Sequence, residues 1–469
     1  MDTVDKRSMS IRQAFSFNRS SRRRFSARHS ALLSAAFATA FLALPHADAE
    51  ILSLADALAA AASNLDVTLA TRGLAAAQAD IAAADHAPLP QLSAKLSQID
   101  LQNGIGGGNP LTQRRIDKGV GLDWTWERGD KRGLRTEAAR RNAAAAAADV
   151  DAVRMLQKLA TQAAFFDLLA AQGRIEQLAV IARSARQTAD TARARLKAGD
   201  LAVQDAARAD IEAERVQADG ATAQLDLQRA QFALAQLTGR ESEAASLSAQ
   251  ADWPADEAPS SNANANANAN ANNAANNMPS LDALVDLRAD VRAAAERVRA
   301  AESALQGSSA QRQSDITWGA SVDHYPGTST RLVEFRLAMP LAFGYRYEGE
   351  IARSQAQLDQ ARDALEKTRR SASTELQRLR SEMATAAQRA QRYSGEIVPR
   401  SREVADRAEQ AYNKGALPLT DLLDARRTLR AVLLEALAAR TDLAKAQGAW
   451  QLRSAGPAGT TSTSNASTR

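Results

Sequence analysis

The feature that most constrains this chain is a unit that occurs twice: alternating strands, a long helical stretch and a turn centred on glycine. In the first copy, residues Arg115 to Glu127 alternate apolar and polar side chains, and a helical stretch then reaches Arg195-Leu196-Lys197-Ala198-Gly199. In the second copy, Thr330 to Leu341 alternate in the same way, and the corresponding turn is Ala411-Tyr412-Asn413-Lys414-Gly415. This order predicts two internal repeats that form a tube with two kinds of wall.

The helical stretches are too long for an ordinary globular core. From Lys131 to Lys197 the sequence has no proline and only two glycines, Gly133 and Gly173, so it predicts one helix of about 67 residues and about 100 Å. Such a length is typical of coiled coils and helical barrels. Aromatic residues make up only 4% of the chain and alanine is abundant, so bulky core residues are scarce. We therefore expect a mainly α fold with a small β part.

Turn residues and composition divide the chain into successive parts. The expected parts are an export signal over 1–49, a first repeat over 50–239 with strands 91–101 and 115–127, a linker over 240–279, a second repeat over 280–454 with strands 315–325 and 332–341, and a disordered tail over 455–469. The Asn-Ala tract from Asn262 to Ala271 marks the linker, because it is too polar and repetitive to bury a core. Helices are expected over about 52–85, 203–237, 281–306 and 350–413, and Pro399 should kink the last of these or mark a join.

Residues 1–49 have the composition of a cleaved export signal. A basic segment precedes the apolar stretch Ala31 to Leu44, and the small-residue site Ala47-Asp48-Ala49 stands directly before Glu50. Ser21-Arg22-Arg23-Arg24-Phe25 resembles a twin-arginine signal, so two export routes stay open, and Met9 is an alternative start. The chain has no cysteine, which excludes disulfide bonds and a lipid anchor through an N-terminal cysteine.

The basic net charge belongs to this leader. Its eight basic and three acidic side chains account for the whole formal net charge of +5, which leaves the rest of the chain neutral. A neutral chain offers no basic surface for a phosphate backbone. We therefore expect no nucleic acid partner.

The predicted strands have the length and alternation of membrane-spanning strands. One face of the second strand carries Ile116, Val120, Leu122, Trp124 and Trp126, and Lys118 interrupts it. Trp124, Trp126, Trp318 and Phe335 are expected to face lipid or to form an aromatic girdle. The alternative is a soluble antiparallel sheet with one buried face.

A spanning sheet would have to close on itself. Beyond the leader no apolar run of about 18 residues occurs, so a membrane passage would require a closed barrel. Four strands do not close a pore and a free edge is not tolerated, so several chains must share one barrel. Three copies would supply twelve strands.

With these strands, repeats and turns, the chain resembles the TolC-like outer membrane channel family, the exit ducts of tripartite efflux pumps and type I secretion systems. The resemblance covers about residues 51–454. It implies a homotrimer with a twelve-stranded β-barrel in the outer membrane, continued by a long α-helical barrel in the periplasm. It also implies a periplasmic adaptor and an inner-membrane pump as partners, and contact with outer membrane lipid.

The resemblance assigns roles to residues near the two turns. The turns would contact the adaptor through Gly199, Gly415 and Leu417. Asp421 and Asp424 stand six and nine residues beyond Gly415, where the family has aspartates that line the periplasmic gate. A threefold ring of these carboxylates would attract cations and repel anions.

Two further positions correspond to the lock that keeps the gate closed in the family. Asp205 lies six residues beyond Gly199, where an acid bonds a tyrosine, and that tyrosine is here Tyr412. The family's arginine two residues beyond the second glycine is replaced here by Leu417, so the salt-bridge part of the lock is expected to be missing.

The sequence shows no constellation for catalysis. After the leader only His86 and His324 remain, and neither has a partner at metal-ligand spacing. We expect no enzyme activity, no cofactor and no metal site, and we expect passive conduction of metal cations or small toxic molecules.

Several alternatives remain from the sequence. Glu127-Arg128-Gly129-Asp130-Lys131-Arg132 is similar to a pattern in the cobalt-zinc-cadmium efflux branch, but it also fits a charged helix start. A type I protein secretion duct would have the same architecture. A periplasmic coiled-coil adaptor would explain the helices but not the strands, and a soluble hydrolase would have to use the two histidines.

Overall fold

The computed structural model describes residues 51–97, 102, 106–109, 116–251, 253–254, 280–325, 329–341 and 343–454. The expected export signal, the expected tail and most of the expected linker lie outside these residues. The described residues all belong to one compact unit, Ala49–Arg469.

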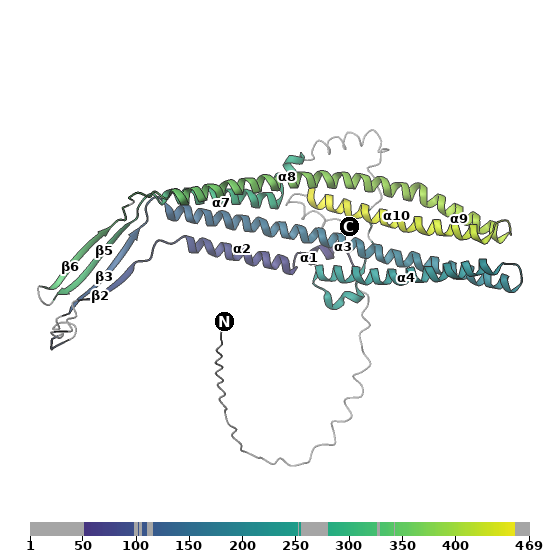
Figure 1. Ribbon diagram of the computed structural model, residues 1–469, viewed down its shortest axis with the longest axis horizontal. Coiled ribbons are helices and arrows are strands. Elements are labelled where there is room, and N and C mark those ends of the chain that lie inside the picture. The colour runs from purple at the N-terminus through teal and green to yellow at the C-terminus, as the bar shows by residue number, and fades with distance from the viewer. Residues whose placement is uncertain are drawn as a thin grey trace, which may run out of the picture. The chain divides into compact units, whose positions relative to one another are not determined.

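Long helices make up most of this unit, and a small sheet accompanies them (Figure 1). The helices are α1 (Leu54–Ala61), α2 (Leu65–Ala84), α3 (Lys131–Lys197), α4 (Val203–Thr238), η1 (Glu241–Ser246), α6 (Leu281–Leu287), α7 (Ala289–Ala310), α8 (Glu348–Arg392), η2 (Tyr393–Ile397), α9 (Val398–Asn413) and α10 (Leu419–Ser454). The strands are β1 (Ile51–Leu52), β2 (Gln91–Ser97), β3 (Asp117–Trp126), β4 (Ser248–Ala249), β5 (Ile316–Tyr325) and β6 (Ser329–Ala338). The prediction of a mainly α fold with a small β part is confirmed.

Two of the expected helices are interrupted. The helix expected over 52–85 breaks after Ala61, and Asn64 begins α2 by accepting a hydrogen bond from the Asp66 amide. The Asn64 side chain also donates to the Leu237 carbonyl of α4, 3.0 Å away. The helix expected over 281–306 breaks at Arg288, whose extended backbone separates α6 from α7. The first break therefore combines a local cap with a contact far along the chain.

Pro399 marks a join in the second hairpin. Proline has no amide hydrogen, so the carbonyl of Gly395 four residues earlier loses its helical partner. The chain accommodates this with one π-helical segment, η2, between α8 and α9. By contrast, α3 contains no proline and runs unbroken over 67 residues.

The four long strands form one antiparallel sheet in the order β2-β3-β5-β6. Strand β6 differs from the expected span 332–341, because it begins at Ser329 and ends at Ala338. Pairing decides both ends: Ser329 already pairs with Tyr325, and Ala338 pairs with Thr317 near the start of β5. Pro340 lies just beyond, where a residue without an amide hydrogen does not extend the pairing.

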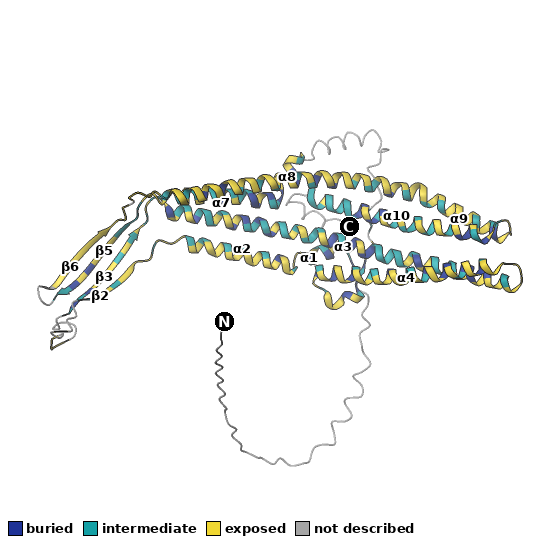
Figure 2. Ribbon diagram, in the orientation of Figure 1, coloured by how far each residue is buried: buried dark blue, intermediate teal, exposed yellow. Residues whose placement is uncertain are grey.

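The sheet has the reverse polarity of a soluble one. Its apolar side chains are exposed, among them Leu92, Leu96, Val120, Leu122, Trp124, Trp126, Trp318, Val322, Val333, Phe335 and Leu337. The small and polar side chains of the other face are buried in β3 and β5, including Asp117, Ser321 and Asp323. Figure 2 shows this alternation along both strands, and β6 is exposed throughout its described side chains. A soluble sheet with one buried apolar face is therefore not what the chain forms.

The first part of the expected linker contributes to the apolar core, although its composition was expected to be too polar to bury one. Helix η1 follows α4, and β4 pairs in parallel with β1, so that Ser248 and Ala249 lie beside Ile51 and Leu52. Trp253 stacks on Phe166 with ring centroids 6.2 Å apart. Leu247 is buried in the same apolar cluster. Short pairing and packing with the start of the repeat thus hold this segment in place.

Helix α3 is the central packing element. It contacts α2, α4, α7 and α10, while α8 contacts α7 and α10. Its Phe165, Phe166 and Leu168 lie almost fully buried in a cluster with residues of β1, β4 and α4. Helices of the first and second repeats therefore pack side by side along α3. None of the described helices carries an apolar run of the length that a bilayer requires.

Candidate functional site: the helical hairpin tips

Both glycine turns close their helices with the same pair of backbone hydrogen bonds. The four bonds are Gly199 N–H to the Leu196 carbonyl (3.0 Å), Asp200 N–H to the Arg195 carbonyl (2.9 Å), Gly415 N–H to the Tyr412 carbonyl (3.0 Å) and Ala416 N–H to the Ala411 carbonyl (2.9 Å). This is the Schellman arrangement, in which the glycine adopts a positive φ. The φ values of Gly199 and Gly415 are +81° and +73°. The two hairpins thus end in equivalent, exposed turns.

An apolar cluster joins the two hairpins behind their tips. Its buried members are Ala189 and Ala192 of α3, Ala206, Ala209 and Ala213 of α4, Tyr412 of α9, and Leu419, Leu422 and Leu423 of α10. The first hairpin contributes small side chains and the second contributes large ones, which is a complementary way to fill an interior. Leu417 packs against this cluster and is half-buried, whereas Gly199 and Gly415 are exposed.

The two expected gate aspartates lie on the exposed side of α10. Asp421 and Asp424 are both exposed, while Leu422 and Leu423 between them face the cluster. Asp421 accepts a hydrogen bond from Thr420 at 3.3 Å, and Asp424 pairs with Arg427 of the same helix at 3.2 Å. Within one protomer these carboxylates therefore carry no contact to the other hairpin in the described residues.

The hydrogen bond that the resemblance implied between Asp205 and Tyr412 is not formed. Asp205 pairs with Arg208, one turn along α4, at 3.3 Å. The Tyr412 side chain is buried, and its hydroxyl has no hydrogen-bond partner among the described residues. Its ring instead lies under the Arg195 guanidinium, 4.6 Å from the ring centroid. Within the described chain the ring packs into the cluster, and the bond to Asp205 in an assembled gate stays a prediction.

A charged contact that the sequence did not single out connects the hairpins instead. Glu212 of α4 is buried and pairs with two arginines of α10, Arg427 at 2.8 Å and Arg430 at 3.2 Å. The Arg427 contact is a hydrogen bond, and it raises the pKa of the Arg427 guanidinium. Arg430 is oriented for charge attraction but not for a hydrogen bond. One signal was present: Glu212 falls on the same helical face as the buried alanines of α4, where a charge requires a partner.

The charged segment 127–132 forms the joint between sheet and helices. Lys131 is buried and pairs with Asp315 at 2.8 Å, and Asp315 also accepts a hydrogen bond from the Arg128 amide. Glu127 pairs with Arg135, and Arg132 pairs with Asp85 at the end of α2. The ion pairs of this segment are thus formed with neighbouring elements. A charged helix start accounts for these ion pairs. Within the described ranges, no group of three His, Asp or Glu side chains is arranged to hold a metal ion.

The expected lipid-facing residues lie on the exposed face of the sheet. Trp124 and Trp318 are directly paired across β3 and β5, and Trp318 is paired in turn with Leu337 of β6. Phe335 is 82% exposed, and Trp124, Trp126 and Trp318 are all more than half exposed. These side chains form one continuous apolar surface, which a protein in water does not normally display.

Comparison with known proteins identifies the family. A model of the outer membrane efflux proteins matches residues 57–240 and 261–452, one segment for each repeat. A search of curated protein sequences finds no match.

The fold is similar to several solved structures. VceC, an outer membrane protein of Vibrio cholerae, has a TM-score of 0.67 and 19% identity over 86% of this chain and 96% of its own. A membrane protein from Pseudomonas aeruginosa has a TM-score of 0.72 and 17% identity over 86% and 93%. CusC, described as forming a transmembrane channel, has a TM-score of 0.68 and 18% identity over 86% and 92%.

At these identities the structural likeness establishes the fold, and the family model establishes membership. The expectations of an efflux channel family and of an outer membrane location are confirmed by that model. The chain belongs to the outer membrane efflux protein family.

Proposed function

We propose that this chain is the outer membrane channel subunit of a tripartite efflux pump and provides its exit duct. Three copies would assemble a twelve-stranded barrel from their sheets and a helical barrel from their hairpins. The duct would conduct metal cations or small toxic molecules passively from the periplasm to the exterior. A periplasmic adaptor would contact the tips at Gly199 and Gly415, and an inner-membrane pump would supply the substrate.

The observation that carries this proposal is the polarity of the sheet. Its apolar face is exposed and its polar face is buried in β3 and β5, and among the described residues both outer strands, β2 and β6, have a free edge. An apolar outer face is stable against lipid, and free edges are avoided when copies of the chain pair with one another. A periplasmic coiled-coil adaptor has no use for such a sheet.

The arrangement of the chain's parts belongs to the same proposal. Residues 1–49 would be removed as an export signal, 50–239 and 280–454 would each supply half of the wall, and 240–279 would join them. The exposure of Asp421 and Asp424 on α10 supports a gate in which these carboxylates from three copies face one another.

The gate is tested by single-channel recording in planar bilayers. The double variant Asp421→Ala, Asp424→Ala removes six carboxylates from the proposed ring, so block of the current by a trivalent cation should weaken about tenfold or more. The control is Asp359→Ala, Asp363→Ala, which removes the same charge from exposed positions of α8. Equal block in the gate variant and the unmodified chain would remove these aspartates from the gate.

The duct itself is tested by fractionation and conductance. We expect the chain in the outer membrane fraction, as an oligomer that resists SDS until it is heated, and as discrete conductance steps in bilayers. Recovery only from the soluble periplasmic fraction, with no such oligomer, would contradict the proposal.

A further inference from the structure

A cavity of about 620 Å³ lies among α1, α3, α6, α7 and α10, outside the hairpin tips. Its volume falls in the range of sites that bind small organic molecules. One part of the wall is apolar and consists of Leu54, Leu58, Met155, Leu156, Leu284, Leu287 and Leu452. Leu156 and Leu287 are about half exposed, whereas Leu284 is buried. The apolar wall therefore continues from the interior to the surface.

The rest of the wall carries an excess of positive charge. The basic side chains are Arg154, Lys158, Arg288, Arg292 and Arg453, and the acidic ones are Asp151 and Asp290. Arg154 and Arg292 share a single carboxylate, that of Asp151, at 3.3 and 3.2 Å. Lys158 forms no ion pair with any of the described residues. The lining thus holds more cations than its own carboxylates neutralise.

The two buried arginines are incompletely satisfied. Arg288 pairs with Asp290 and Glu375, at 2.8 and 2.9 Å, and Arg453 pairs with the same Glu375 at 3.0 Å. Their side chains are only 7% and 10% exposed. Even so, Arg288 Nη1 and Arg453 Nε have no hydrogen-bond partner among the residues that the structure describes. A buried donor without a partner is destabilising, so a further acceptor here would be stabilising.

The pKa shifts of the two arginines also indicate that Arg453 lacks a full set of acceptors. Burial, and next the repulsion by Arg288, lower the pKa of Arg453 below its ordinary value. For Arg288, burial is likewise the largest influence, but hydrogen bonds and charge from Asp290 and then Glu375 raise its pKa overall. The carboxylates around Arg288 therefore outweigh the effect of its burial, whereas those around Arg453 do not.

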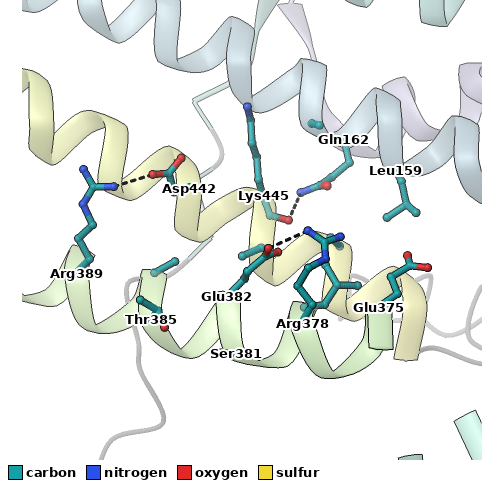
Figure 3. Close-up of a pocket in the computed structure, with 15 residues that line it drawn as sticks. Leu159, Gln162, Glu375, Arg378, Ser381, Glu382, Thr385, Arg389, Asp442 and Lys445 are labelled. Carbon is teal, nitrogen blue, oxygen red and sulfur yellow. Dashed lines mark hydrogen bonds and ion pairs between the residues drawn. The ribbon is translucent and has the colours of Figure 1, made fainter. Parts of the chain in front are cut away.

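A neighbouring cavity of about 760 Å³ is lined by basic side chains that pair with carboxylates (Figure 3). There Arg389 pairs with Asp442 at 2.9 Å, and Arg378 pairs with Glu382 at 2.8 Å. Lys445 pairs with Asp167 of α3. Gln162 lies in the wall of both cavities and donates to the carbonyls of residues 444 and 445. The charge excess is thus particular to the first cavity and does not extend to the second.

We propose that the cavity beside Arg288 and Arg453 is a binding site for a small organic anion with an apolar body. The anionic group would lie near Arg288, Arg453 and Lys158, and the apolar body would pack against Leu54, Leu58 and Leu284. The site is separate from the gate and does not depend on the channel function.

Isothermal titration of the purified, detergent-solubilised full chain with 1,5-naphthalenedisulfonate tests this site. We expect saturable binding, with a dissociation constant below about 1 mM, and no binding of the neutral analogue 1,5-dihydroxynaphthalene. Arg453→Gln should weaken binding about tenfold or more, since it removes a charged hydrogen-bond donor. Lys158→Gln should weaken it about threefold or more and leave the fold intact, because Lys158 has no ion pair to lose.

The matched control is Arg378→Gln, which removes one positive charge from the neighbouring cavity. Its dissociation constant should equal that of the unmodified chain. Absence of binding to the unmodified chain would overturn the proposal, and so would equal weakening by Lys158→Gln and Arg378→Gln, which would indicate only general charge attraction. Because the readout is binding, failure here would leave the proposed duct function untouched.

Discussion

At the scale of single residues, two reciprocal pairs shape the polar face of the sheet. Gly119 of β3 is paired with Asp323 of β5, and Asp123 of β3 is paired with Gly319 of β5. A Cβ atom at Gly119 would lie 2.0 Å from Asp323 Oδ1, and one at Gly319 would lie 2.2 Å from Asp123 Oδ1. Each carboxylate therefore lies over the glycine opposite it. These glycines are required for space and not for an unusual φ, unlike the tip glycines.

Gly119→Ala should consequently destabilise the chain by about 1–3 kcal/mol, because the added methyl displaces a carboxylate that is only 4% exposed and is held by Ser321. The thermal unfolding midpoint of the purified protein measures this. The double variant Gly119→Ala, Asp323→Ala should recover part of the loss, whereas Gly73→Ala in α2, where no atom lies within 4 Å, should not lower the midpoint. If the single and double variants have the same unfolding midpoint, the contact between Gly119 and Asp323 does not limit the size of residue 119.

At the scale of elements, the two hairpins differ although their tips are equivalent. The first has the unbroken helix α3, and the second has a π-helical segment next to Pro399 between α8 and α9. Tyr393 in this segment donates a hydrogen bond to Glu435 of α10 at 2.9 Å. The two hairpins are held together near their tips by small-to-large apolar packing and by Glu212.

Glu212→Gln should loosen this contact, because it leaves Arg427 and Arg430 without their shared carboxylate. Breaking a buried ion pair costs about 3–5 kcal/mol. Hydrogen exchange followed by mass spectrometry should show protection falling at least about tenfold in peptides that span 185–213 and 408–423. Glu214→Gln, an exposed neighbour on the same helix, is the control and should leave protection unchanged. Unaltered exchange in the Glu212 variant would mean that apolar packing alone joins the hairpins.

At the scale of the whole molecule, the four-stranded sheet is incomplete by itself. Within the described residues its outer strands β2 and β6 each pair on one side only, so their other backbone groups need partners. The simplest arrangement pairs β6 of one copy with β2 of the next, and a ring of three copies closes without a free edge.

Cysteine cross-linking tests this arrangement directly, since the chain has no cysteine of its own. Ser93→Cys in β2 combined in turn with Glu334→Cys or Arg336→Cys in β6 should give a ladder up to a trimer on a non-reducing gel. All three positions lie on the polar face, which fixes their side in any register. Ser93→Cys with Ser303→Cys in α7 should give no ladder, and monomer alone in every β2–β6 pair would exclude edge-to-edge assembly.

Much of the fold could be predicted because it depends on residues that are close together in the sequence. The helix over Lys131–Lys197 has the predicted ends, since proline, glycine and periodicity act within a few residues. Both tips form where glycine turns were expected. The gate aspartates lie exposed, which local periodicity also allows, although their opposition in an assembled gate stays a prediction.

Other features depended on partners far away in the chain. The ends of β6 follow from its pairing with β5, the break before α2 from Asn64 and Leu237, and the order of 241–249 from β1. Tyr412 packs under Arg195 instead of bonding Asp205. The helices, the alternation and the repeats follow from local sequence, because these arise from backbone preferences and side-chain period. Strand register, ion-pair partners and the charge excess of the cavity became known from the folded chain, because these arise where distant side chains meet.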